Sequence, residues 1–414
     1  MLVLFMVTIF LRDIFSIFIS EPVFLVMPIK IFVLIYLLAL VKKLGNLSRI
    51  SSLYIIITLI IYEFYSIVIT TLYMDMTLMQ SILYVTRGEM IFFVAVLFSL
   101  IIDSPSDLYR IAVILLIPLT FEILLGLSEL VYGNHEIVDY LLPFLNEEES
   151  YEEFFKQSQR NIISEYFGGS ASNVHLYGTL KRANTYANFL IFAPILLFVM
   201  IDESKSRKWR IYWRTLFFIS IIVLYFSFSR GSLGSVLIMF LFFYYRNKLN
   251  LRNKVLMVLA IVFLWFLSEF IFANQIARYY DRTQQLTSRI FLWEYYWNEI
   301  TGFNSINLLF GSHQLRGFIE ETGYAAHNFV LILLFDRGIV GLFLYILFIF
   351  MVIRAKDQSK NLILKALKYS FIAFVLSQIF DNKIGDEFHR MYFFTYGSIV
   401  LAYSSVSKHF RLEQ

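Results

Sequence analysis

The chain has 414 residues, of which 59% are hydrophobic and 16% are charged, and it contains no cysteine. Soluble globular proteins have about 45–50% apolar and about 25% charged residues, so this composition excludes a soluble globular chain and a disordered one. The lack of cysteine excludes a disulfide scaffold and a thiolate metal site. The net charge, 35 basic minus 31 acidic residues, is only +4, so it does not indicate a nucleic-acid-binding protein. We therefore predict an all-α, polytopic membrane protein forming a single integral membrane domain over residues 1–414.

Apolar runs recur along the whole chain, and a run of about 20 residues is long enough to cross a bilayer as a helix. The first run contains Arg12 and Asp13, and a bare charge at mid-depth is costly, so this segment either spans the membrane or lies partly in its interface. We expect about twelve spans, near residues 2–19, 23–41, 51–72, 78–102, 108–131, 185–201, 215–228, 231–245, 255–272, 328–353, 367–380 and 391–405.

Lysine and arginine gather between these runs, at residues 42–49, 205–214, 246–254 and 354–368. The positive-inside rule assigns such segments to the cytoplasm, and an even number of spans between them places both termini there as well. Two long outer loops follow from this topology, at residues 132–184 and 273–326, the second with partly helical segments. Loops of this length usually carry a function, so we expect the functional site on the outer face.

Three arginines near the outer ends of helices are candidate ligands for a phosphate group. Arg230 follows Ser229 in a turn between two spans, and we expect Gly231 and Ser232 to form the bend there. A guanidinium at this place suits bidentate phosphate binding, whereas the alternative is an arginine that reaches lipid headgroups. Arg182 stands just before another span, and Arg289 lies in the second outer loop. Each of these two could also be an ordinary surface arginine.

His327 is the candidate catalytic residue. A straight helix from Asn328 to residue 353 would be about 39 Å long, more than the hydrocarbon core of about 30 Å. We therefore expect this helix to break at Asp336-Arg337-Gly338 and His327 to lie above the membrane. A neutral imidazole can accept a proton from a sugar hydroxyl, which lysine and arginine cannot do at pH 7. The alternative is a structural loop histidine.

Taken in order between residues 178 and 344, these segments resemble the O-antigen ligase and O-antigen (Wzy-type) polymerase superfamily. The chain departs from the family pattern at Gly311-Ser312-His313, where Gly-x-Gly is frequent, and at Asp336, where glutamate is common. The matching features are Arg182 ahead of a helix start with Asn188, the turn Ser229-Arg230-Gly231, Arg289 followed by Trp293, and His327-Asn328 followed by Gly338 and Gly341.

The resemblance implies a fold similar to that of lipid-dependent (GT-C-like) glycosyltransferases in the bacterial cytoplasmic (inner) membrane. It implies a polymerase of O-antigen, capsule or exopolysaccharide repeat units, with undecaprenyl-diphosphate-linked oligosaccharides as donor and acceptor and with no metal ion or cofactor. Expected partners are this lipid-linked glycan, the bilayer and other polysaccharide-assembly membrane proteins. In this interpretation His327 is the base, Arg182, Arg230 and Arg289 bind the diphosphate, and Ser229, Asn328, Asp336 and Arg337 are secondary candidates.

Two other functions remain open from the sequence. An O-antigen ligase would transfer the finished glycan to lipid A core or another acceptor, and it would need the same base and the same diphosphate ligands. A flippase or other transporter would be expected to have internal repeats, short outer loops and ionisable groups near mid-membrane. The sequence has long predicted outer loops and no visible repeat, although four ionisable residues, Lys30, Glu63, Arg87 and Glu122, do lie in or near predicted spans.

Overall fold

The computed structural model describes residues 53–73, 105–132, 183–227, 229–246, 290–312, 318, 326, 328–355, 361–378 and 387–412. Within these ranges all regular structure is helical and no β-strand occurs, which confirms the predicted all-α class for this part of the chain. The chain forms two compact units. Among the described residues, those from 106 to 246 belong to unit 1, and those from 53 to 105 and from 290 to 412 belong to unit 2.

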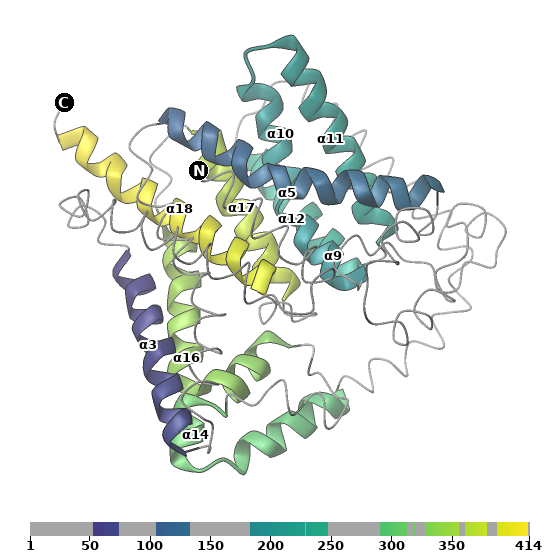
Figure 1. The fold of residues 1–414 in the computed structure, drawn as a ribbon. Helices are drawn as coiled ribbons and strands as arrows, with labels where there is room; N and C mark the ends of the chain where they lie inside the picture. Colours follow the sequence, from purple (N-terminus) through teal and green to yellow (C-terminus); the bar gives the residue numbers. More distant parts are fainter. Residues whose placement is uncertain are drawn as a thin grey trace, which may run out of the picture. The chain divides into compact units, whose positions relative to one another are not determined.

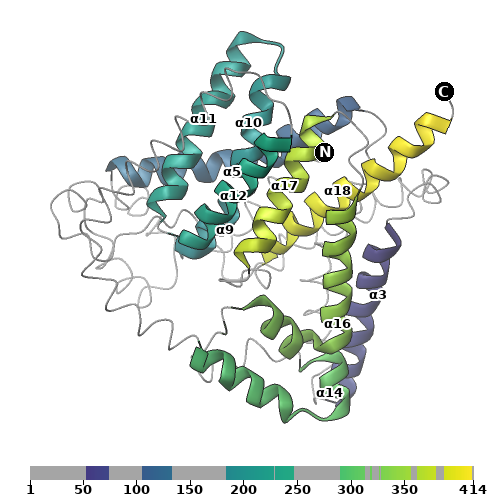
Figure 2. The ribbon, with the colours of Figure 1, turned by 180° about the vertical axis from the view of Figure 1, so that it is seen from behind.

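Unit 1 is built around a hairpin of two helices, α10 (Pro194–Glu203) and α11 (Arg207–Phe226), which lie side by side (Figure 1, Figure 2). Phe198 of α10 contacts Phe217 of α11 and Phe240 of α12, with ring centroids 5.6 and 4.9 Å apart. The other described helices of the unit are α5 (Pro105–Tyr132), α9 (Ala183–Leu190) and α12 (Arg230–Arg246).

A break at residues 191–193 separates α9 from α10 within one predicted span. Pro194 causes it, because proline has no N–H to bond the carbonyl of Leu190 four residues earlier. The Ala193 N–H bonds the Leu190 carbonyl instead, at 3.0 Å, and α10 restarts with Pro194 in its first turn. The apolar stretch therefore remains one candidate span, Thr185–Glu203, with a bend in it.

Close packing in unit 1 depends on Gly126 of α5. The Tyr186 hydroxyl donates a hydrogen bond to the Glu122 carbonyl at 2.7 Å, and a Cβ atom on Gly126 would overlap that hydroxyl and Val223. We expect Gly126→Ala to lower the free energy of unfolding by about 1–3 kcal/mol through overpacking. Gly234→Ala in α12 is the matched control, since a Cβ there meets no atom within 4 Å. Thermal unfolding of the purified variants checks this, and equal midpoints for the two would contradict it.

Unit 2 is organised around α16 (Phe329–Arg354), which lies next to α3 (Leu53–Tyr73) and α18 (Glu387–Leu412) (Figure 1). α17 (Leu362–Ser377) contacts α18, while α14 (Ser305–Phe310) contacts α16, and a further helix covers residues 290–301. Aromatic side chains fill the contact of α16 with α17 and α18: Phe348 touches Phe371 and Phe394, with ring centroids 5.9 and 5.1 Å apart.

Three helices of unit 2 begin at an asparagine whose side chain caps the helix. The Asn304 side chain accepts from Asn307 N at 2.8 Å, and that of Asn361 accepts from Leu364 N at 3.1 Å. The Asn328 side chain accepts from Val330 N and Leu331 N, at 3.0 and 3.3 Å. Such caps satisfy amides that have no partner within the helix, so they fix where α14, α17 and α16 start.

Four helices in the described part are long and apolar enough to cross a membrane: Ser106–Val131, Thr185–Glu203, Arg207–Phe226 and Phe329–Arg354. They indicate an integral membrane protein. Helices α3, α12, α17 and α18 also fall on predicted spans. The predicted spans at residues 2–19, 23–41, 78–102 and 255–272 lie outside the described residues, as do residues 133–182 of the first predicted outer loop. The number of twelve spans therefore stays a prediction.

Candidate functional site

The residues predicted from the sequence to act directly are mostly outside the described part of the chain. His327, Arg182 and Arg289 are not among the described residues, and of Arg230 only the backbone is described, as the first residue of α12. Their neighbours in sequence are described, however. Ile290 and Trp293 follow Arg289, and Ala326 and Asn328 stand on either side of His327.

The two chain neighbours of His327 are both held by hydrogen bonds. The Trp293 indole N–H donates to the Ala326 carbonyl at 2.7 Å, and Ala326 is fully buried. On the other side, Asn328 caps α16, and the next N–H, of Phe329, donates to the carbonyl of Gln378 at 3.4 Å. Trp293 and Ala326, which are 33 residues apart in the chain, therefore meet in unit 2.

Helix 290–301 is anchored next to these residues by a small aromatic core. Tyr296 and Ile300 are buried against Phe335 of α16, and the rings of Tyr296 and Phe335 meet edge to face at 5.4 Å. Burial raises the pKa of Tyr296 to about 12, helped by the negative charge of Asp336 and opposed by a hydrogen bond with the Ala326 backbone. The phenol is thus protonated at neutral pH. Together with Trp293, Tyr296 is the second side chain of this helix that contacts Ala326.

The predicted break in the long helix is confirmed at Gly338, whose backbone is non-helical with φ 65° and ψ −172°. A Cβ on Gly338 would overlap Leu309, and a Cβ on Gly311, with φ 86°, would overlap Asp336 and Arg337. These positive φ values and close approaches favour glycine at both positions. The Ser312 N–H also donates to the Phe335 carbonyl at 2.8 Å. The chain after α14 is therefore joined directly to the break in α16.

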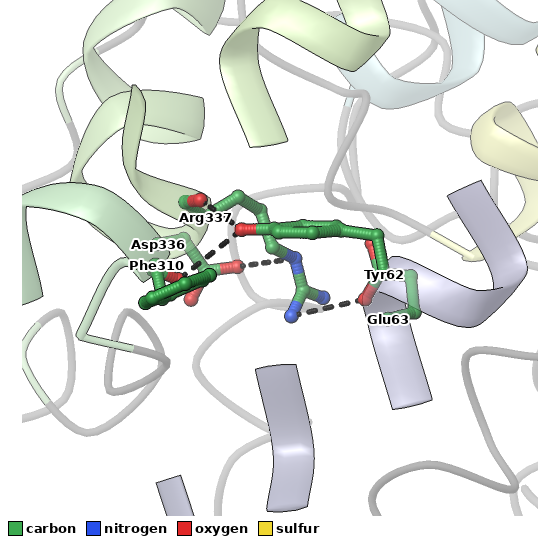
Figure 3. A network of polar contacts seen from close by, with 5 residues as sticks. All are labelled: Tyr62, Glu63, Phe310, Asp336 and Arg337. Carbon is green, nitrogen blue, oxygen red and sulfur yellow. Dashed lines mark hydrogen bonds and ion pairs between the residues drawn. The ribbon is translucent and has the colours of Figure 1, made fainter. Parts of the chain in front are cut away.

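Arg337 stands at this break between two carboxylates (Figure 3). Its Nη1 lies 3.2 Å from Glu63 Oε2 of α3, and its Nε lies 3.4 Å from Asp336 Oδ2. The three side chains are 5–13% exposed, so their charges are largely removed from solvent. The second oxygens, Glu63 Oε1 and Asp336 Oδ1, have no hydrogen-bond partner among the described residues. Arg337 is thus held by an ion pair with α3 rather than exposed as an open anion site.

Tyr62 joins the same contact from α3 (Figure 3). Its hydroxyl donates to the carbonyl of Arg337 and lies 3.3 Å from the carbonyl of Phe310, at the end of α14. A Cβ on Gly341 would overlap the Arg337 Cβ and would lie 3.0 Å from the Tyr62 hydroxyl, so the glycine makes room for both side chains. The pattern Gly338-x-x-Gly341 thus has a structural account: the first glycine permits the break, and the second leaves room for Arg337 and Tyr62.

The Ser229-Arg230-Gly231 segment differs from the prediction in where the chain bends. α12 already begins at Arg230, so Gly231 lies inside the helix and not in the bend. Ser229 precedes the helix, and its carbonyl accepts from Leu233 N at 3.0 Å. Its hydroxyl lies 2.8 Å from that of Ser232, and both serines are buried. These contacts of Ser229 and Ser232 stabilise the first turn of α12.

Sequence reasoning missed Tyr62 and the partner of Arg337. Glu63 carries the only charge in α3, and an ionisable residue within an apolar helix is a signal of a paired or functional group. Within the described residues, no group of three His, Asp or Glu side chains could hold a metal ion.

No family model matches the chain, and no curated protein is significantly similar to it.

Proposed function

We propose that the protein is a membrane glycosyltransferase that polymerises oligosaccharide repeat units carried on a polyprenyl diphosphate. The proposed fold has about twelve membrane-spanning helices and is similar to that of lipid-dependent (GT-C-like) glycosyltransferases, with both termini in the cytoplasm of a bacterium. The reaction is at the outer face of the cytoplasmic membrane. The repeat units are those of an O-antigen, a capsule or an exopolysaccharide, and the substrate chemistry rests on the resemblance described above.

The observation that supports this function best is the hydrogen bond from Trp293 to Ala326. It connects the segment after the loop arginine, Arg289, to the segment that contains His327. Transfer of a glycosyl group from a diphosphate needs a base near the attacking hydroxyl and positive charge near the leaving group. Arg289 precedes the helix that carries Trp293, and His327 directly follows Ala326. A candidate cation and a candidate base thus both stand close in sequence to the Trp293–Ala326 contact.

The proposed reaction is attack by an acceptor hydroxyl on the anomeric carbon of the donor. A bond forms between the acceptor oxygen and that carbon, and the bond from the carbon to the diphosphate oxygen breaks. His327 accepts the hydroxyl proton, while Arg289, Arg182 and Arg230 offset the negative charge that develops on the polyprenyl diphosphate. Asn328 and the Arg337–Glu63 ion pair position the part of α16 that precedes the break at Gly338. Asn328 caps its first turn, and the ion pair holds its other end.

Arg289→Lys and Arg230→Lys test the diphosphate role in cells that lack the native copy. Lysine keeps the charge but loses bidentate geometry, so we expect less long polymer at normal membrane levels of the protein. Analysis of glycan length also separates polymerase from ligase. Single repeat units on the final acceptor indicate a polymerase, whereas long chains retained on the carrier lipid indicate a ligase. Wild-type glycan profiles in both variants would contradict the assignment of these arginines.

Trp293→Phe tests the contact that carries the proposal. Phenylalanine keeps the ring but cannot donate to Ala326, so the segment around His327 loses one anchor. We expect the rate of glycan elongation to fall by about 10- to 100-fold because small displacements of reacting groups are costly. Trp297→Phe on the same helix is the matched control, since Trp297 is 54% exposed. Elongation rates measured at equal membrane levels check this, and equal rates for both variants would contradict it.

A transporter is the second candidate function, and the buried charges of unit 2 favour it. Glu63 and Arg337 are each about 5% exposed, and Arg390 of α18 is 8% exposed and hydrogen-bonded to Tyr345. Ionisable residues within apolar helices often mark a translocation path. In this protein, however, Arg337 and Glu63 pair with each other at the break in α16, next to α14. This pairing accounts for the two buried charges without a translocation path. Uptake or flipping of lipid-linked glycan by the His327→Ala variant at the wild-type rate would favour transport.

A further inference from the structure

The short connection between α10 and α11, with the first two turns of α11, forms an exposed basic surface in unit 1. We name residues 202–214 the basic hairpin end. It contains two acidic residues, Asp202 and Glu203, and five basic residues, so its formal charge is 5 − 2 = +3. The basic residues are Lys205, Arg207, Lys208 and Arg210, which are exposed, and Arg214, which is half-buried. Such a concentration of cations is a surface for an anionic partner.

Aromatic and aliphatic side chains are exposed among these cations. Trp209 is 53% exposed, Ile211 53% and Tyr212 40%, whereas Trp213 is buried and anchors the group. The Trp209 ring stacks on Trp213 with centroids 5.7 Å apart, and it meets Tyr212 edge to face at 5.5 Å. These contacts explain why α11 begins at Arg207 and not near residue 215, where the apolar run begins. Exposed tryptophan and tyrosine beside cations are typical of the membrane–water interface.

The basic hairpin end follows one candidate span and begins the next. The buried apolar residues of α10 end at Ile201, and the apolar part of α11 begins near Leu216. Both Thr185–Glu203 and Arg207–Phe226 are long and apolar enough to cross a bilayer. α10 and α11 lie side by side as a hairpin (Figure 1, Figure 2). Two adjacent spans joined by a short connection place that connection at the edge of the hydrocarbon core.

Hydrogen bonds hold this connection in one shape. The Ser204 hydroxyl donates to the Met200 carbonyl at 2.6 Å, and Arg210 Nη2 donates to the Ser204 carbonyl at 3.2 Å. Arg207, Arg210 and Arg214 are spaced three and four residues apart, so they share one face of α11. These bonds fix the connection and hold Arg210 against it, while the other cations project from the same short segment.

We propose that the basic hairpin end binds the phosphate headgroups of anionic phospholipids in the cytoplasmic leaflet. Lysine and arginine side chains donate to the lipid phosphates, while Trp209, Ile211 and Tyr212 enter the interfacial layer beside them. An acidic protein would match the charge, but the half-exposed apolar side chains at the end of two spans favour the lipid surface. This binding fixes the hairpin in the membrane with its basic end inside, and it does not depend on the proposed glycosyl transfer.

Energy transfer between the protein and labelled lipids tests the proposal. The chain has no cysteine, so a single cysteine at Ser206, which is exposed and makes no capping bond, accepts a donor fluorophore. The full-length protein is reconstituted in phosphatidylcholine vesicles that contain headgroup-labelled phosphatidylglycerol or headgroup-labelled phosphatidylcholine as acceptor. We expect the anionic acceptor to be enriched about fivefold over the neutral one near the label. This factor corresponds to the attraction of about 1 kcal/mol that one basic residue has for an anionic lipid surface.

Salt and a set of variants provide the controls. In about 1 M salt the Debye length falls to about 3 Å, and the enrichment should disappear in the wild-type protein. The triple variant Lys205→Gln, Arg207→Gln, Lys208→Gln should lose it at low salt, whereas Arg110→Gln, at an exposed arginine of α5, should keep it. Equal transfer to the two acceptors in the wild-type protein at low salt would overturn the proposal, as would enrichment that survives the triple variant.

Discussion

Replacing His327 with alanine is expected to lower the rate of glycosyl transfer by about 100- to 10,000-fold, the usual contribution of a positioned general base. The side chain is lost while its neighbours keep their anchors, because Ala326 is held through its backbone carbonyl and Asn328 through its own side chain. The protein should therefore reach the membrane at normal levels. Glycan length in cells that lack the native copy, together with the amount of protein in the membrane, measures this.

His135→Ala is the matched control for this variant. His135 lies in the first predicted outer loop, so this change removes an imidazole that has no proposed role in the reaction. We expect wild-type polymer from His135→Ala and single repeat units from His327→Ala. Long polymer from both variants would show that the imidazole of His327 is not the base.

Arg337→Met is expected to cause the largest loss of stability. It leaves Glu63 and Asp336 buried at 5% and 13% exposure without their cation. Removing one partner of a buried ion pair typically costs about 3–5 kcal/mol. The same ion pair connects α3 to the residue next to the break in α16, so glycan elongation should fall as well. Thermal unfolding of the purified, detergent-solubilised protein measures the loss.

Arg354→Met on the same helix is the control for Arg337→Met. Arg354 is exposed at the end of α16, where it lies over the Phe350 ring at 5.8 Å. Such an exposed contact is worth at most about 1 kcal/mol. Arg337→Lys should fall between the two variants, because lysine keeps the charge but cannot contact both carboxylates as the guanidinium does. If Arg337→Met unfolds at the wild-type temperature, the ion pair does not hold the break.

The helices of this protein follow from local sequence, while the contacts between them do not. Apolar runs predicted helices at α3, α5, α16 and α18 because burial of apolar surface in a bilayer needs long unbroken segments. The break at Gly338 was predictable from the length of the run and the polar Asp336-Arg337 pair within it. The bend between α9 and α10 carries a local signal, Pro194, that the span prediction did not use.

Most of the contacts that position the candidate site were not predictable from the sequence. Arg337 pairs with Glu63, and Trp293 bonds the Ala326 carbonyl, and neither partner is near in the chain. Such pairs depend on which helices lie side by side, and a single sequence does not encode that in a local pattern. The start of α11 at Arg207 was missed for a similar reason: apolar runs identify the hydrocarbon segment, whereas stacking of Trp209 on Trp213 extends the helix beyond it.

Elongation of purified substrate by the reconstituted protein tests the central claim most directly. Lipid-linked repeat units that accumulate in cells lacking the native copy are extracted and supplied to the wild-type protein in vesicles. The proposed function predicts products that grow by whole repeat units with release of polyprenyl diphosphate, and no growth with His327→Ala. Unchanged repeat units after incubation with folded wild-type protein, or equal growth with His327→Ala, would contradict it.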